Sequence, residues 1–147
     1  MEKNDLKLKK EWFIEKGTGK IEDNYEIDER MELGQGTYGR VIKAKNKTTK
    51  VVRAIKIIPK AKVKNHERFA TEINILKEID HPNIIKLFET HEDSRNVYLV
   101  FEVCDGGELF DRIIAKGHFN EQQARTIFTQ IMKSLFYCHK HGICHRD

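Results

Sequence analysis

Residues 33–58 constrain the fold more than any other stretch. They begin with three glycines, Gly34, Gly36 and Gly39, in the pattern G-x-G-x-x-G-x-V, which ends at Val41. Glycines at this spacing form a tight loop whose backbone N–H groups can approach a phosphate chain, because no Cβ stands in the way. A lysine on a neighbouring strand can then neutralise the phosphate oxygens. The stretch therefore predicts a loop that holds a nucleotide.

The residues after the glycines separate two kinds of nucleotide site. In a dinucleotide-binding unit the glycine loop leads into a helix. Here it leads into residues 41–44, a polar turn over 45–50 and a β-branched run over 51–58, which contains Lys56. This pattern predicts strand, turn and strand. It favours a loop within a β-sheet, although an ordinary hairpin with flexible glycines would give the same local pattern.

The rest of the chain predicts three more strands and three helices. The strands are expected over residues 25–33, 84–90 and 97–104. Asn65 is a helix cap before residues 66–79, where Phe69, Ile73 and Leu76 form an apolar stripe. Two further helices are expected over 108–115 and from Asn120, with Gln123 completing a capping box, to about His141. The order of elements predicts an α+β fold.

Glu72 lies beside the apolar stripe of the predicted helix over 66–79. At about 100° per residue it stands about 60° from Phe69 and about 40° from Leu76, so it should point towards the body of the domain. A single helical glutamate is most simply a solvated side chain. Because Lys56 needs a partner, we interpret Glu72 as the carboxylate that pairs with it.

Composition limits the classes of protein to which the chain can belong. Its 147 residues suffice for a domain with a buried core, and 34% of them are charged. No run approaches the about 18 apolar residues of a membrane span, and residues 1–5 lack the apolar core of a signal peptide. Three cysteines, an odd number, argue against a disulfide framework and favour a reducing compartment. We therefore expect a cytoplasmic protein.

Basic residues are concentrated between residues 33 and 66, where the chain has no Asp or Glu. Such a stretch can indicate nucleic-acid binding. Strand alternation would send these charges to both faces of a sheet, and only Tyr38 is available there to stack on a base. We therefore expect a solvated surface and no nucleic-acid partner.

Residues 138–145 hold five potential metal ligands, namely Cys138, His139, His141, Cys144 and His145. Zinc is conceivable, but the spacing matches no standard finger pair. Cys138 and His139 also point about 100° apart on a helix. We therefore expect no metal site in this chain.

The chain ends in His145-Arg146-Asp147. Together with the glycine loop, Ala54-Ile55-Lys56 and Glu72, this motif resembles the H-R-D motif of protein kinases. The resemblance covers residues 25–147. It implies a two-lobe α+β fold, with a polar extension over 1–24 and an N-terminal lobe and hinge over 25–104. That lobe would contain a five-stranded antiparallel sheet and one helix. Residues 105–147 would begin an incomplete helical C-terminal lobe.

A finer resemblance comes from residues 79–87, 106–113 and 137–139. They look like the calcium/calmodulin group of Ser/Thr kinases, and most like the calcium-dependent protein kinases, whose catalytic domain is followed by EF-hands. The chain has no D-x-[DN]-x-[DN]-G loop. Calcium would therefore act only through regions outside this sequence.

The resemblance implies roles in phosphoryl transfer. Lys56 would pair with the α- and β-phosphates of ATP, and Glu72 would hold Lys56 in place. Asp147 would accept or orient the proton of the substrate hydroxyl. The loop over the phosphates would be formed by Gly34, Gly36 and Gly39.

The resemblance also implies the adenine contacts. Apolar surface above and below the ring would come from Leu33, Val41 and Ala54. Phe101 would be the gatekeeper that narrows the pocket, and the backbone of Glu102 and Cys104 would bind the adenine edge. Glu108 would reach the ribose and favour a substrate arginine. Arg53 replaces the valine of the usual V-A-I-K motif and should face away from the nucleotide.

As a whole, the resemblance implies a kinase that uses ATP and Mg²⁺ to phosphorylate Ser or Thr in proteins, near basic residues. The Mg²⁺ ligands of the family lie beyond this sequence, so the 147 residues alone are expected to be inactive. The alternative is a non-catalytic module that binds a nucleotide or a partner. The apolar stripe over residues 124–136 is expected to be exposed and to drive self-association.

Overall fold

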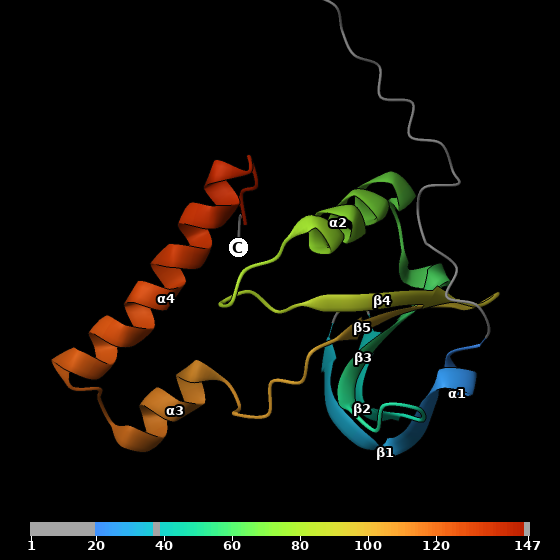
Figure 1. Cartoon of the computed structure of the whole chain (residues 1–147), viewed down its shortest axis with the longest axis horizontal. Helices are drawn as coiled ribbons and strands as arrows, with labels where there is room; N and C mark the ends of the chain where they lie inside the picture. The colour runs from blue at the N-terminus through green and yellow to red at the C-terminus, as the bar shows by residue number, and fades with distance from the viewer. Residues whose placement is uncertain (1–19, 37–38, 146–147) are drawn as a thin grey trace, which may run out of the picture. The chain divides into compact units, whose positions relative to one another are not determined.

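The computed structural model describes residues 20–36 and 39–145, which form two compact units. The N-terminal unit comprises the described residues up to Glu78 together with Leu87–Val103. The C-terminal unit comprises Ile79–Lys86 and the described residues from Cys104 onward. Figure 1 shows the elements of each unit.

The N-terminal unit is built on a five-stranded antiparallel sheet with the strand order β1-β2-β3-β5-β4. A four-residue helix, α1 (Ile21–Asn24), precedes the sheet, and η2 (Lys60–Lys62) and α2 (His66–Glu78) lie between β3 and β4 in the sequence. The strands are β1 (Tyr25–Gly36), β2 (Gly39–Asn46), β3 (Val52–Pro59), β4 (Leu87–Glu92) and β5 (Asn96–Phe101). The glycine loop thus joins two strands, and the α+β prediction with an antiparallel sheet is confirmed. A dinucleotide-binding unit, in which the loop enters a helix, is excluded.

The two faces of the sheet carry two separate hydrophobic clusters. Successive side chains of a strand point to opposite faces. In β3, Ile55 and Ile57 therefore enter one cluster, whereas Ala54 and Ile58 enter the other. We call the first the α1-side cluster, formed by Ile21, Tyr25, Ile42, Ala44, Ile55, Ile57, Tyr98 and Val100. The second is the α2-side cluster, formed by Ala54, Ile58, Ile73, Leu87, Val97, Leu99 and Phe101.

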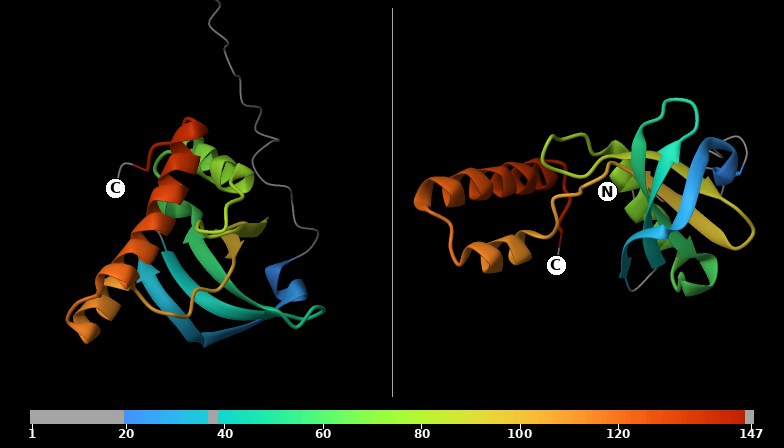
Figure 2. Two further views of the ribbon diagram at one scale, coloured as in Figure 1. Left: turned by 60° about the vertical axis from the view of Figure 1, so that its left-hand side comes forward. Right: turned by 90° about the horizontal axis from the view of Figure 1, so that it is seen from below.

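Figure 2 shows the curl of the sheet in two further views. The Tyr25 hydroxyl donates to Glu89 Oε1 at 2.8 Å, and Glu89 Oε2 accepts from His91 Nε2 at 3.0 Å. Tyr25 is in β1 and Glu89 is in β4, the two outer strands in the sheet order. This bond therefore joins the two edges of the curled sheet. Burial raises the pKa of Tyr25.

Several element boundaries differ from the prediction. β1 runs on to Gly36 because Gly34, Gln35 and Gly36 pair with β2. β4 begins at Leu87 instead of residue 84, because residues 81–84 form a turn in which Ile84 N donates to the His81 carbonyl at 3.0 Å. The predicted polar extension over 1–24 did not anticipate α1, whose Ile21 is buried. Residues 1–19 lie outside the described residues.

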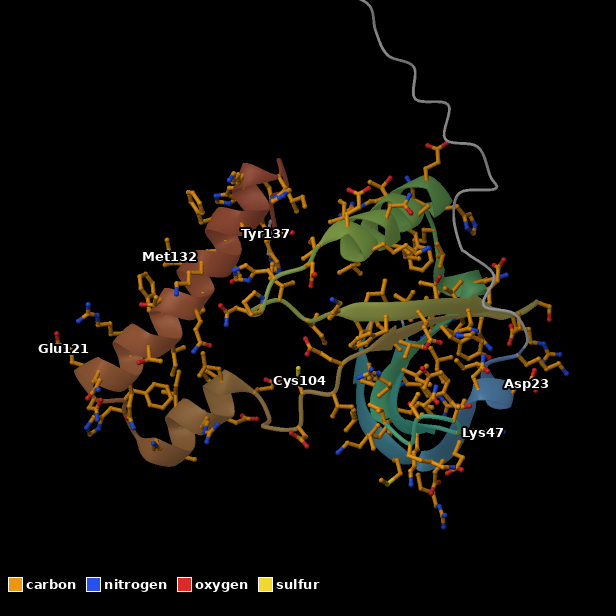
Figure 3. All side chains as sticks on the ribbon, in the orientation of Figure 1. Asp23, Lys47, Cys104, Glu121, Met132 and Tyr137 are labelled. Carbon is orange, nitrogen blue, oxygen red and sulfur yellow. The ribbon has the colours of Figure 1, made fainter. Side chains whose placement is uncertain are left out.

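The C-terminal unit contains α3 (Leu109–Lys116) and α4 (Glu121–Lys140). The predicted capping box is confirmed, since Asn120 Oδ1 accepts from Gln123 N at 2.8 Å and Gln123 Oε1 accepts from Asn120 N at 3.3 Å. Figure 3 shows Tyr137 on α4 directed towards the loop over 79–86, and its hydroxyl accepts from Asp80 N at 3.2 Å. Among the described helices, none has the length and apolar character needed to cross a membrane.

Candidate nucleotide-binding site

Lys56 lies on the face of the sheet that α2 covers. It is flanked along β3 by Ala54 and Ile58, which share its side of the strand and belong to the α2-side cluster. Directly across β2 its partner is Val41, and across β5 its partner is Leu99. Lys56 is half-buried. Strand alternation therefore directs this ammonium group towards a largely apolar surface.

Three of the residues predicted to contact adenine lie on the same face as Lys56. Ala54 and Phe101 are directly opposite each other on β3 and β5, and both are buried. Val41 packs against the same cluster. Leu33 in β1 is different, because 45% of its surface is exposed to solvent. The N-terminal unit thus has an apolar surface next to a cation, a combination suited to an aromatic base with an attached polyphosphate.

Arg53 lies on the opposite face of β3. It shares its side of the strand with Ile55 and Ile57, which enter the α1-side cluster. Its guanidinium carbon stands 3.7 Å from the centroid of the Phe88 ring, which is a cation–π contact. As expected from strand alternation, the departure from V-A-I-K does not alter the face that carries Lys56.

The three glycines of the loop have different surroundings. A Cβ on Gly34 would meet no atom within 4 Å, and one on Gly36 would meet only the Gly39 carbonyl oxygen at 3.9 Å. A Cβ on Gly39 would lie 1.9 Å from the carbonyl oxygen of Ile57. Gly39 is therefore required by the close approach of β2 to β3, whereas a side chain would find open space at Gly34 and Gly36, which pair with β2. Thr37 and Tyr38 lie outside the described residues.

The structure does not bring Lys56 and Glu72 together. Glu72 Oε1 accepts a hydrogen bond from Arg68 Nε at 3.2 Å, one helical turn earlier on α2, and the Glu72 side chain is 59% exposed. Within residues 20–36 and 39–145, Lys56 has no ion pair or hydrogen bond of its side chain. Arg68 was missed by the sequence interpretation. Its spacing of four residues from Glu72, which makes two helical side chains neighbours, was the available signal.

The groups with shifted pKa values lie away from Lys56. At the turn between β4 and β5, burial raises the pKa of Tyr98 to about 12, helped by the bond from its hydroxyl to Asp93 Oδ2 at 2.7 Å. Burial opposes the charge of Asp93, but hydrogen bonds from Tyr98, Asn96 and Arg95 outweigh it and lower the pKa of Asp93. These pKa shifts follow from burial of Tyr98 and from the hydrogen bonds of the turn, so they do not mark the candidate site.

The remaining predicted site residues lie at or beyond the end of the N-terminal unit. Glu102 follows β5, and Cys104 is an exposed free thiol in the C-terminal unit, labelled in Figure 3. Glu108 is exposed at the N-cap position of α3, where its side chain makes no capping bond. Asp147 lies outside the described residues. Within the described part of the chain, no three His, Cys, Asp or Glu residues are grouped so that they could hold a metal ion.

Comparison with known proteins supports the kinase interpretation of this arrangement. The protein kinase domain family matches residues 27–147. Calcium-dependent protein kinase 5 of Plasmodium falciparum (isolate 3D7) is 55% identical over 127 residues, which cover 86% of this chain and 22% of that protein. Calcium-dependent protein kinase 3 of Plasmodium yoelii yoelii is 49% identical over 144 residues, which cover 98% of this chain and 27% of that protein. The chain thus spans about a quarter of the length of these relatives.

A solved structure gives the corresponding match in three dimensions. The crystal structure of Rad53 residues 1–466 in complex with AMP-PNP is 35% identical in sequence, with a TM-score of 0.76. The match covers 86% of this chain and 33% of that chain. The family match over residues 27–147 and this shared fold agree with the antiparallel sheet of the N-terminal unit. This chain belongs to the protein kinase family and is similar to the calcium-dependent protein kinases.

Proposed function

We propose that the protein of which these residues are the kinase region transfers the γ-phosphate of ATP to Ser or Thr of protein substrates. The observation that carries the proposal is the face shared by Lys56, Val41, Ala54 and Phe101, which combines a cation with an apolar surface. It is supported by the names of the relatives and by the solved neighbour bound to AMP-PNP.

In this proposal the residues of the N-terminal unit bind and orient ATP. Phosphoryl transfer requires little covalent chemistry from the protein, so positioning and charge neutralisation supply most of the catalysis. Gly34 and Gly36 would present backbone N–H groups to the phosphates, and Lys56 would neutralise the α- and β-phosphate oxygens. Adenine would lie against Leu33, Val41 and Ala54, with Phe101 behind it. Gly39 would act indirectly, by allowing β2 to approach β3.

The other roles fall on residues near or in the C-terminal unit. The backbone of Glu102 and Cys104 would bind the adenine edge, and Glu108 would contact the ribose and a basic residue of the substrate. Its exposed carboxylate suits a cationic partner. Asp147 would orient the substrate hydroxyl. Mg²⁺ would be bound by residues that this sequence does not contain.

Regulation by calcium and a cytoplasmic location form the finer part of the proposal. Regulation by calcium is supported by the relatives, which are calcium-dependent protein kinases by name. The cytoplasmic location is supported by the odd number of cysteines, which favours a reducing compartment. Self-association of the 147-residue chain is also proposed, because α3 and α4 expose Phe110, Phe128 and Phe136. Light scattering at two protein concentrations tests it, and a monomer at both would contradict it.

The deciding experiment measures phosphate transfer from radiolabelled ATP to a basic Ser/Thr peptide, using the full-length protein with calcium or with a chelator. Lys56→Met should lower the rate by at least about 10²-fold, because it removes a preorganised charge from the transition state. Lys45→Met, an exposed lysine on β2, is the matched control and should leave the rate unchanged. Full activity of Lys56→Met would refute the site. Nucleotide binding without transfer by the full-length protein would support the non-catalytic alternative.

A further inference from the structure

Strand β4 contains a bulge that changes the face to which its side chains point. Leu87 lies opposite Phe101 on β5, and both belong to the α2-side cluster. The next paired residue of β4 is Glu89, opposite Val100, so Phe88 is one extra residue in this strand. Val100 belongs to the α1-side cluster, and residues directly opposite each other share a face. The bulge therefore moves Glu89 to the α1 side, whereas a regular strand would keep it on the side of Leu87.

Two contacts on the α1 side begin at this bulge. The guanidinium carbon of Arg53 stands 3.7 Å from the centroid of the Phe88 ring. Glu89 Oε1 accepts a hydrogen bond from the Tyr25 hydroxyl at 2.8 Å. The two contacts are neighbours, because burial raises the pKa of Tyr25 and the positive charge of Arg53 acts on the same hydroxyl to lower it. Two consecutive side chains of β4 thus meet a cation of β3 and a hydroxyl of β1.

These contacts join strands that are not neighbours in the sheet. In the order β1-β2-β3-β5-β4, β5 separates β3 from β4, and β1 and β4 are the two outer strands. The pairing of β1 with β2 changes register between Ile27 and Glu32 and again between Glu32 and Gly34. Because this ladder is irregular, the contact of Tyr25 at the first residue of β1 adds a fixed point that the ladder does not supply.

We propose that Arg53 is a positioning residue that, with Tyr25 and the β4 bulge, braces the α1 side of the sheet and so fixes β1 and β3 for a nucleotide on the other face. The inference rests on the proposed function, in which β1 leads into the glycine loop and β3 carries Lys56. Arg53 stands where the usual V-A-I-K motif has a valine, and a valine has no charge to place over the Phe88 ring. A sheet without the brace occupies other arrangements for part of the time, and its apparent affinity for a nucleotide falls by that fraction.

A double-mutant cycle on the full-length protein, with TNP-ATP fluorescence as the measure of binding, tests the brace. Phe88 is 41% exposed, so Arg53→Val should weaken binding by about two- to fivefold, the size of a cation–π contact at an exposed site. Arg53→Lys should keep most of the affinity, because an ammonium group can also lie over the ring. In the Phe88→Leu background, Arg53→Val should have no further effect. An equal loss in both backgrounds would come from the lost charge alone and would refute the brace.

A pair of tyrosine variants tests the same brace without changing any charge. Tyr25→Phe should also weaken TNP-ATP binding, because it releases the first residue of β1 from Glu89. Tyr98→Phe is the matched control, since it removes another hydroxyl that is bonded to a carboxylate in the same cluster, at Asp93, and should leave the affinity unchanged. Equal weakening by both tyrosine variants would refute a specific role of the contact between β1 and β4.

Urea unfolding of the same samples separates positioning from stability. A brace that only stabilises the fold would lower the free energy of unfolding and leave TNP-ATP affinity unchanged, and this result would overturn the inference. If Arg53→Val does not fold, Phe88→Leu and Tyr25→Phe decide, because wild-type affinity in both refutes the brace. If the wild-type protein fails to bind TNP-ATP, the proposed function fails together with this inference. If it binds and Lys56→Met weakens that binding, wild-type affinity of Arg53→Val refutes the inference alone.

Discussion

The two units of this chain use similar apolar content in opposite ways. Among the described residues, every buried apolar side chain lies in the N-terminal unit. In the C-terminal unit neither α3 nor α4 has a buried residue, and Phe136 is 71% exposed. The curled sheet buries the α1-side cluster on one face, and α2 helps to bury the α2-side cluster on the other face. Two amphipathic helices joined by a short loop enclose none, so their order depends on caps and local hydrogen bonds.

The comparison predicts that Gly39→Ala is the most destabilising of the small substitutions. Its Cβ would lie 1.9 Å from the carbonyl oxygen of Ile57, and two paired strands cannot separate without losing their hydrogen bonds. We expect a loss of about 4 kcal/mol in the free energy of unfolding. Gly34→Ala, with open space around it, should change stability by less than about 1 kcal/mol. Urea denaturation followed by circular dichroism measures both, and equal losses would contradict the close approach.

Truncation of one apolar side chain in each unit tests whether apolar residues are buried in the N-terminal unit and exposed in the C-terminal unit. Ile55 is fully buried, so Ile55→Ala should cost about 3 kcal/mol through lost burial and a cavity. Phe136→Ala removes a larger side chain, yet it should change stability by less than about 0.5 kcal/mol because that ring is already in water. A comparable cost for both variants in urea denaturation would show that α4 buries this face in solution.

Two tyrosines provide a matched test of a single hydroxyl. Tyr25 donates across the curled sheet to Glu89, whereas Tyr137 accepts from the backbone of Asp80 at an exposed loop. Tyr25→Phe should cost about 1–2 kcal/mol, because a hydrogen bond to a charged group inside the structure is lost. Tyr137→Phe should cost about 0.5 kcal/mol. Hydrogen exchange of β1 and β4 should rise in the first variant only, and protection that stays unchanged would argue against an edge-to-edge link.

The smallest expected effect is a pH dependence in the N-terminal unit. Hydrogen bonds lower the pKa of Asp93 below its ordinary value of 3.8. A lowered pKa in the folded state means that the stabilisation is present above about pH 4 and is lost as the pH falls through the folded pKa. Asp93→Asn should therefore be less stable than the wild type at neutral pH, and the difference should shrink in acid. Thermal unfolding between pH 7 and pH 3 measures this, and a constant difference would refute the assignment.

Local patterns in the sequence were sufficient for much of the fold. The period of two in residues 51–58 sends Lys56 to the face of Ala54 and Ile58, and the structure confirms a strand there. The capping box at Asn120 depends on residues three apart, so it too could be predicted. The exposure of the stripe on α4 also agrees with expectation. All of these depend on contacts between residues close in the chain.

Contacts between distant segments could not be predicted in this way. The hydrogen bond between Tyr25 and Glu89 forms because the whole sheet curls and brings β1 close to β4. A glycine is needed at position 39 because the carbonyl oxygen of Ile57 in β3 lies where a Cβ would be. The partner of Glu72 is different in kind, because Arg68 lies one helical turn earlier on α2 and its spacing of four residues was a local signal that the interpretation of Glu72 did not use.

The sequence by itself determined the presence of the five strands and of α2, α3 and α4, the capping box at Asn120, the face of β3 that carries Lys56 and the resemblance to protein kinases. Each of these follows from residue periodicity or from a short motif. Only the tertiary structure decided that Gly39 serves packing and that the two edges of the sheet meet. The reason is physical: periodicity specifies the direction of a side chain, but a close approach or a choice of partner depends on atoms that only folding brings together.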